Sequence, residues 1–183
     1  MEGQSRRDLF RIAAGAVVVA PLTAQEIAQG PRFFTAAEFK VLDELTEIII
    51  PADDHSPGAR AAQVAAYIDK HVSEALEDQP RRTFREGLKL VESLCQEMHG
   101  KAFMDADPAQ RVAVVARMAK NERHPAKPEE RFFGELKGAV VFAYYTSKIG
   151  IHQEMEYKGN TVQTEFSGYD ADLVPIQLPP STK

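Results

Sequence analysis

Cysteine is nearly absent from this sequence, because Cys95 is the only one among 183 residues. A single cysteine excludes an internal disulfide, and it excludes the paired-cysteine motifs that bind zinc or attach haem covalently. Cys95 falls on the apolar side of a helical pattern, where a small core residue is expected rather than a reactive thiol. The fold must therefore be stable without a disulfide, through a helical core or through a partner protein.

Sequence motifs of catalysis are missing as well. The 11 glycines are scattered, so no glycine-rich phosphate-binding loop can be identified, and no His-Glu-x-x-His zinc motif occurs. The formal net charge of −5 disfavours binding to nucleic acid or to an anionic membrane surface. We therefore expect no catalytic site, no cofactor and no nucleic-acid partner for this chain.

An uncharged run lies close to the start of the chain, over Ile12–Ala24. Its length suits the apolar region of a signal peptide and falls short of the ~20 residues that span a bilayer. The preceding Ser5-Arg6-Arg7-Asp8-Leu9-Phe10-Arg11 resembles a twin-arginine export signal, which is read by a translocase that exports folded proteins. We predict a signal peptide over residues 1–24 and a periplasmic location, with an ordinary secretory signal or an uncleaved anchor as the alternatives.

Hydrophobic spacing beyond the signal indicates helices and no strand pair. After a linker over residues 25–34, a helical domain is predicted over residues 35–159 and an extended arm over residues 160–183. Leu76 and Val112 are expected among the inward-facing residues. The fold class is all-α: a compact bundle of about five helices with a long irregular C-terminal arm. The helices are expected at residues 35–50, 59–77, 81–99, 107–120 and 128–149.

Several helix ends carry recognisable signals. Gly100 occupies the place of a C-terminal cap, and Pro51 and Pro80 are expected to end or separate helices. Capping-box patterns predict two helix starts, one at Thr35 with Glu38 and one at Asp107 with Gln110.

The loop between the first two predicted helices contains Asp53, Asp54 and His55. These side chains invite a metal-binding hypothesis, but three consecutive residues do not usually converge on one ion. We interpret the segment as a solvated acidic loop that shapes the turn before the next helix. A ligand or metal site that adds His124 is the alternative, and it would make the chain a free-standing periplasmic helical binding protein.

A second cluster follows the last predicted helix. Tyr144, Tyr145, Thr146 and Ser147 lie together at the helix end, and Tyr157 follows them. Tyrosine combines a large apolar ring with a polar tip, which suits protein interfaces. Two interpretations stay open from the spacing alone: these tyrosines contact a partner, or they cap the domain's own core.

Two longer segments are specific enough to suggest a family. The first reads IIIPADDHSPGARAAQVAAYIDKHV and the second reads FFGELKGAVVFAYYTSKIGIHQEMEYKGN. Together, and behind a twin-arginine start, they resemble the gluconate 2-dehydrogenase subunit 3 family. The resemblance extends over about residues 33–160, and its most telling parts are the Tyr-Tyr-Thr-Ser-x-Ile-Gly and Tyr-x-Gly-Asn runs.

The resemblance implies a small, cofactor-free subunit of a periplasmic dehydrogenase. Its partner would be a large flavoprotein of the glucose-methanol-choline oxidoreductase type, which carries FAD and oxidises sugars, sugar acids or polyols. A c-type cytochrome with haem c would often accept the electrons. The large subunit would fold around FAD in the cytoplasm and cross the membrane through the twin-arginine translocase on the signal of Arg6 and Arg7. The complex would then be periplasmic, or held at the membrane through a partner or an uncleaved signal.

On this interpretation the C-terminal signature and the arm supply the partner interface. Some members of the family carry a cysteine after the Tyr-x-Gly-Asn run, whereas the arm of this sequence has none, so attachment to the partner should be noncovalent. The expected interface residues are Tyr144, Tyr145, Thr146, Ser147, Ile149, Gly150, Tyr157, Gly159, Asn160, Phe166 and Tyr169.

Overall fold

The computed structural model describes residues 30–160, and the predicted signal peptide and nearly all of the predicted arm lie outside them. No strand occurs between residues 30 and 160, which confirms the all-α prediction, and five of the helices are long enough to build a bundle. The elements are α3 (Ala36–Ile49), α4 (Gly58–Ala61), α5 (Val64–Glu74), α6 (Asp78–His99), the 3-10 helix η1 (Phe103–Asp105), α7 (Pro108–Ala119), α8 (Pro128–Tyr145) and the π-helical turn η2 (Gly150–Glu154).

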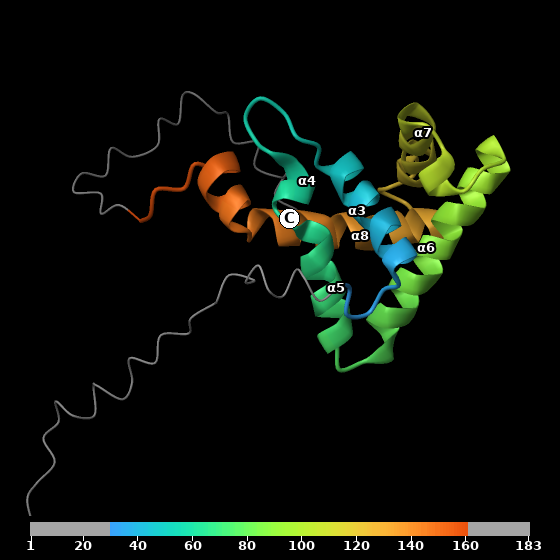
Figure 1. Cartoon of the computed structure of the whole chain (residues 1–183), viewed down its shortest axis with the longest axis horizontal. Coiled ribbons are helices and arrows are strands. Elements are labelled where there is room, and N and C mark those ends of the chain that lie inside the picture. The colour runs from blue at the N-terminus through green and yellow to red at the C-terminus, as the bar shows by residue number, and fades with distance from the viewer. Residues whose placement is uncertain (1–29, 161–183) are drawn as a thin grey trace, which may run out of the picture.

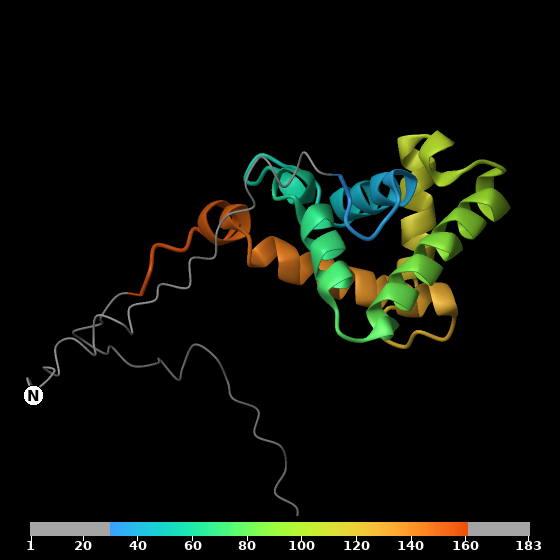
Figure 2. The same ribbon diagram turned by 60° about the horizontal axis from the view of Figure 1, so that its bottom comes forward.

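α8 is the central element of the bundle. It packs against α3, α5, α6 and α7, and Figures 1 and 2 show α5 and α6 diverging from the turn that joins them, with α3 between them. The inward side of α8 contributes a row of buried side chains at helical spacing: Phe132, Phe133, Leu136, Val140 and Tyr144. The hydrophobic core therefore fixes the position of the C-terminal end of α8.

The predicted helix signals are confirmed where side chains cap the backbone. The Thr35 hydroxyl accepts from the N–H of Glu38, and the Glu38 carboxylate accepts from the N–H of Thr35. Asp107 and Gln110 make the same reciprocal pair at the start of α7. Gly100 ends α6 in the left-handed conformation, with φ +67. These local contacts satisfy backbone groups that the helices leave without internal partners.

The predicted helix over residues 59–77 is wrong in two respects. The structure divides it into α4 and α5, because Gln63 adopts the left-handed conformation with φ 57 between them. The second part ends at Glu74, and Leu76 is fully exposed instead of facing the core. Periodicity continues across residues 59–76, but an isolated left-handed residue that is not glycine carries no sequence signal.

Two further boundaries and the orientation of one residue differ from the prediction. α6 begins at Asp78, so Pro80 lies in its first turn, where a missing backbone N–H removes no helical bond. α8 ends at Tyr145, before the predicted end at residue 149. Val112 is 51% exposed on α7, because the buried side of that helix runs through other residues.

Among the helices between residues 30 and 160, none has both the length and the apolar character that crossing a membrane requires.

A buried carboxylate fixes the segment that precedes α3. Asp69 on α5 accepts hydrogen bonds at 3.0 Å from the backbone N–H groups of Phe33 and Phe34. These bonds offset the cost of burying a charged group. Sequence reasoning missed this residue, although an acidic side chain next to Ile68 on the apolar side of a helix is a signal for such a role.

Candidate functional site

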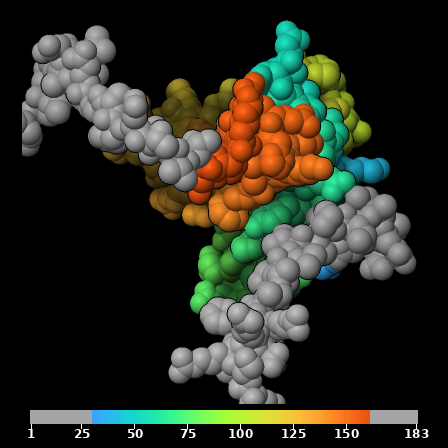
Figure 3. Space-filling view, turned by 90° about the vertical axis from the view of Figure 1, so that its left-hand side faces the viewer, coloured from blue at the N-terminus to red at the C-terminus, as the bar shows by residue number. Residues whose placement is uncertain are grey.

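The two signature segments of the sequence meet at one end of the molecule. Figure 3 looks onto this end, where the orange surface after α8 adjoins the cyan surface of the loop before α4. The Ser56 and Tyr144 hydroxyls are hydrogen-bonded, and the His55 Nε2 lies 3.1 Å from the carbonyl oxygen of Glu154. We call this pairing of residues 51–57 with residues 144–157 the clasp.

The loop side of the clasp is shaped by its own acidic residue. The Asp53 carboxylate accepts hydrogen bonds from the backbone N–H groups of His55 at 2.9 Å and Ser56 at 2.7 Å. The N–H of Asp53 donates to the carbonyl oxygen of Ser56 at 2.8 Å, which closes the turn. Asp53 therefore acts on the backbone, which agrees with the interpretation of this loop as a shaped turn.

The metal-binding alternative has no geometric support in the part of the chain that the structure describes. Between residues 30 and 160, no group of three or more His, Cys, Asp or Glu side chains is arranged to hold a metal ion. The carboxylate of Asp53 is engaged with the backbone, and the His55 ring contacts Glu154. His124 belongs to the turn between α7 and α8, where its N–H donates to the carbonyl of Asn121.

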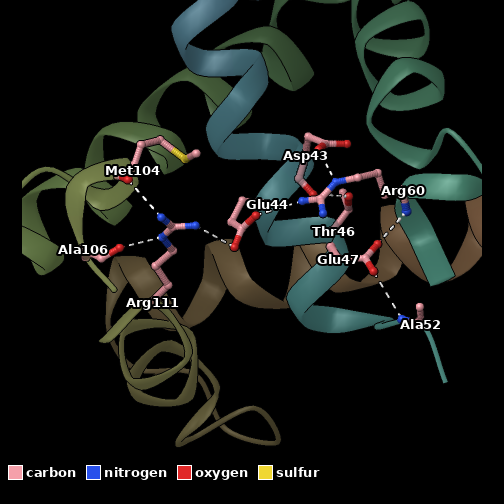
Figure 4. Close-up of polar contacts among 9 residues, drawn as sticks. All are labelled: Asp43, Glu44, Thr46, Glu47, Ala52, Arg60, Met104, Ala106 and Arg111. Carbon is pink, nitrogen blue, oxygen red and sulfur yellow. Dashed lines mark hydrogen bonds and ion pairs between the residues drawn. The ribbon is translucent and has the colours of Figure 1, made fainter. Parts of the chain in front are cut away.

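Acidic residues of α3 hold the loop and α4 in place, as Figure 4 shows. The Glu47 carboxylate accepts from the N–H groups of Ala52 at 3.2 Å and Arg60 at 2.8 Å. The Arg60 guanidinium in turn donates to Asp43 at 2.6 Å and to Glu44 at 2.8 Å. Both ends of the loop are therefore bound to the same helix, and this contact positions Ser56 and His55.

The network continues from Glu44 to α7. Arg111 donates to the Glu44 carboxylate at 2.8 Å and to the carbonyl oxygens of Met104 and Ala106 at 2.9 Å each (Figure 4). Burial alone would raise the pKa of Glu44, but hydrogen bonds from Arg111 and Arg60 outweigh burial and hold that pKa below its usual range. Charge-assisted bonds of this kind fix geometry, so α3 is joined to α4 at the clasp side and to α7 through the same carboxylate.

The other side of the clasp is built by a tight turn after α8. The Ser147 hydroxyl donates to the carbonyl of Tyr144 at 2.6 Å and accepts from the N–H of Gly150 at 3.0 Å. A side chain on Gly150 would overlap the carbonyl of Tyr144, so only glycine fits there. Ile149 is half-buried and packs against the core. Ser147, Ile149 and Gly150 therefore serve the fold of this turn rather than an exposed surface.

The two neighbouring tyrosines have different environments. Tyr144 is fully buried, whereas Tyr145 is 37% exposed, and their rings meet edge to face with centroids 5.3 Å apart. Tyr144 therefore caps the core, which is the alternative that the sequence left open for it. Tyr145 lies on the surface, and so do Thr146, Tyr157, Gly159 and Asn160. Asn160 is the last residue that the structure describes. Phe166 and Tyr169 lie outside the described residues.

Large exposed apolar side chains are concentrated in the last part of the described chain. Of the eight between residues 30 and 160, five fall in or just after the C-terminal turns of α8. We call these five residues the apolar patch: Val141, Phe142, Tyr145, Met155 and Tyr157. Sequence reasoning missed Val141, Phe142 and Met155. A run such as Val140-Val141-Phe142 is a usable signal, because a helix cannot bury three consecutive apolar residues on one narrow face.

Comparison with models of protein families shows to which family this chain belongs. The model of the family described as Gluconate 2-dehydrogenase subunit 3 matches residues 36–161, from the start of α3 to just beyond the clasp. The chain belongs to the gluconate 2-dehydrogenase subunit 3 family. The chain is thus an accessory subunit of a dehydrogenase complex, with a dehydrogenase as its partner. No curated protein and no solved structure matches the chain.

Two titratable groups of this subunit 3 hold the loop side of the clasp. Hydrogen bonds from the N–H groups of Ser56 and His55 lower the pKa of Asp53 below its usual 3.8. The hydrogen bond to the Glu154 carbonyl raises the pKa of His55 above its usual 6.5, and the Glu154, Glu156 and Asp53 carboxylates add to this rise against desolvation. The contribution of the ionised Asp53 to folding stability is lost as the pH falls through its lowered pKa. The contribution of the protonated His55 to folding stability is complete below pH 6.5, and it is lost as the pH rises through the raised pKa.

We expect this protein to lose a little thermal stability relative to its His55→Gln variant as the pH rises from about 6 to about 9. Glutamine keeps a hydrogen-bond donor at this position but carries no charge at any pH. The change is small because the His55 side chain is exposed to solvent. Thermal melts of both proteins across this range, with an NMR titration of the His55 ring, measure it. A constant difference between the two proteins would contradict the prediction.

Proposed function

We propose that this chain is the non-catalytic small subunit of a periplasmic FAD-dependent dehydrogenase that oxidises sugars, sugar acids or polyols. It binds the flavoprotein subunit, supports its folding and stability, and carries it through the twin-arginine translocase on the signal that contains Arg6 and Arg7. The observation that carries this proposal is the match to the subunit 3 family over residues 36–161. The sequence before the matched region supports export, because paired arginines precede an uncharged run.

The surface supports a binding role for this end of the subunit. The apolar patch offers aromatic and Met side chains, which are enriched in protein interfaces, and the polar residues Thr146 and Asn160 adjoin it in the sequence. Large aromatic residues supply much of the binding energy where they enter a partner's pockets. We assign the contact with the flavoprotein to Tyr145, Tyr157 and their neighbours, extended by Phe166 and Tyr169.

The cofactors belong to the other subunits in this proposal. FAD sits in the large subunit of the glucose-methanol-choline type, and haem c sits in a third, cytochrome subunit that accepts the electrons. The sequence supports this assignment, because it contains neither a dinucleotide-binding glycine motif nor a haem-attachment motif. A chain without redox chemistry contributes through binding, which is a property of its surface.

The experiment that tests the proposal is a pull-down of the tagged chain from its native periplasm. We expect a larger chain to elute with it and to show the flavin absorbance band near ~450 nm, a property of the cofactor itself. Tyr157→Asp should weaken this association at least about tenfold, because a charge replaces an aromatic contact in the patch. Titration of the purified flavoprotein against each variant measures the effect.

Val112→Asp is the matched control for this test. Val112 and Tyr157 are 51% and 49% exposed, but Val112 lies on α7 outside the patch. The control should therefore bind the flavoprotein as the wild type does. Equal weakening of binding by both variants would show that the patch is not part of the interface. Elution of the small chain alone, without flavin, would contradict the proposed function.

A further inference from the structure

An open groove runs between α5, the start of α6 and the middle of α8. Its volume is about 560 Å³, and its lining is mainly apolar. The residues that matter for its shape are Tyr67, His71, Pro80, Gly134, Gly138 and Phe142. We call this feature the groove, and it lies on the face of α8 that leads toward the apolar patch.

On the α8 side the floor of the groove is partly formed by backbone, at two glycines. A Cβ built on Gly134 or on Gly138 would meet nothing within 4 Å, so both glycines face open space. The walls are aromatic, because Tyr67 stacks on His71 and lies 6.3 Å from the ring of Phe142. Phe142 is 58% exposed. A surface with aromatic walls and an open backbone floor suits an extended chain with apolar side chains.

The sequence of this protein contains such a segment after Asn160. Residues 173–180 read Leu-Val-Pro-Ile-Gln-Leu-Pro-Pro, in which the glutamine is the only polar residue and no residue is charged. Its prolines fix φ and remove backbone donors, which disfavours a helix or a central strand and favours the extended polyproline conformation. Segments of this kind bind aromatic grooves with a small loss of conformational entropy.

The length of the chain allows this segment to reach the groove. Gly138 lies about 10 Å along the helix axis from Tyr145, at 1.5 Å per residue. The turn η2 packs on the end of α8, and residues 155–160 then run outward from the bundle, as Figures 1 and 2 show. Residues 161–172 can extend over up to about 40 Å, which exceeds the return over residues 155–160, at most about 20 Å, together with the ~10 Å along α8.

We propose that residues 173–180 lie in the groove of their own chain, with apolar side chains against Tyr67, Pro80 and Phe142. Residues 161–172 then form a loop held at both ends, and this loop carries Phe166 and Tyr169. Held in this way, the two aromatic residues bind a partner at a lower entropic cost than on an untethered arm. The docking is a property of this chain alone and does not rest on the proposed function.

The test is disulfide formation in the full chain with Gly138→Cys and Ile176→Cys. The native Cys95 is fully buried, so the engineered pair reacts against a low background. We expect the intrachain disulfide to form at least about tenfold faster than in the matched pair Ser93→Cys and Ile176→Cys, since docking raises the local concentration above that of a free tether. Ser93 is exposed on α6 and does not line the groove. Repeating the reaction with cysteine at positions 173, 174 and 178 gives the register.

Phe142→Asp is expected to reduce the rate of the Gly138 pair to that of the Ser93 pair, with an unchanged circular dichroism spectrum. A second measurement uses the absence of tryptophan from the sequence. The emission of Phe142→Trp should shift to longer wavelength when Ile176→Asp is added. Equal rates for the two cysteine pairs would overturn the proposal. A disulfide from Gly138→Cys to a second copy, or to the dehydrogenase subunit in the assembled complex, would assign the groove to that chain and would also overturn it.

Discussion

Replacement of Arg6 and Arg7 by lysine is expected to leave both this chain and its flavoprotein in the cytoplasm, with loss of nearly all periplasmic dehydrogenase activity. Lysine keeps the positive charge but lacks the planar guanidinium, whose fixed set of donors distinguishes arginine in recognition sites. The flavoprotein is affected because, in the proposed function, it crosses the membrane on this chain's signal. Immunoblots of separated periplasm and cytoplasm, with activity measured in each fraction using an artificial electron acceptor, give the result.

Arg11→Lys is the control for the double replacement. It changes a third arginine of the same segment but keeps the Arg6-Arg7 pair, so both chains should reach the periplasm. Normal periplasmic activity in the double variant would show that another route exports the complex. A periplasmic flavoprotein with this chain left in the cytoplasm would show that the two are exported separately.

The parts of the fold that the sequence predicted are those that depend on contacts between near neighbours. The capping pair of Thr35 and Glu38 spans three residues, and the left-handed Gly100 needs no partner beyond its own turn. Such signals depend only on residues a few positions apart, so helix starts and the all-α class could be predicted. For the same reason the sequence correctly predicts the long periodic helices α3, α6 and α8 as helices.

Helix boundaries failed where packing overrides a local rule. Gln63 breaks a continuous apolar pattern because the packing of α4 and α5 on α3 requires a change of direction there. The sequence predicts a break at Pro80, but the first turn of a helix accepts proline without losing a bond. The left-handed Gln63 depends on tertiary packing that spacing cannot show, whereas Pro80 follows a local rule that depends on where the helix begins.

The candidate site shows the same division between local and distant contacts. Tyr144 and Tyr145 are adjacent and identical in type, and only the direction of α8 in the bundle decides which of them is buried. The contact of Ser56 with Tyr144 joins residues 88 positions apart, so no short motif reveals it. The family resemblance did mark both halves of the clasp, because each half lies within one of the two signature segments.

Gly58→Ala is expected to destabilise the fold by about 3 kcal/mol, and to lower the melting temperature by about 10 °C. Gly58 opens α4 with φ +77, a conformation that costs a residue with a side chain about 1–2 kcal/mol. A Cβ there would lie 2.5 Å from the backbone nitrogen of Ala52 and 2.9 Å from the carbonyl carbon of Pro51. These are backbone atoms of the clasp loop, which cannot move aside as a flexible side chain could. Thermal and chemical denaturation of the purified chain measure the loss.

Gly100→Ala separates the two causes of this loss. Gly100 also has a positive φ, at +67, but a Cβ built on it would meet nothing within 4 Å. This variant should therefore lose only about 1–2 kcal/mol, which is the cost of the conformation alone. The difference between the two variants isolates the contact of Gly58 with the loop, and through the loop the position of Ser56 against Tyr144. Equal losses in the two variants would mean that the loop yields to the added methyl group, and that the clasp does not depend on a fixed backbone at residues 51–52.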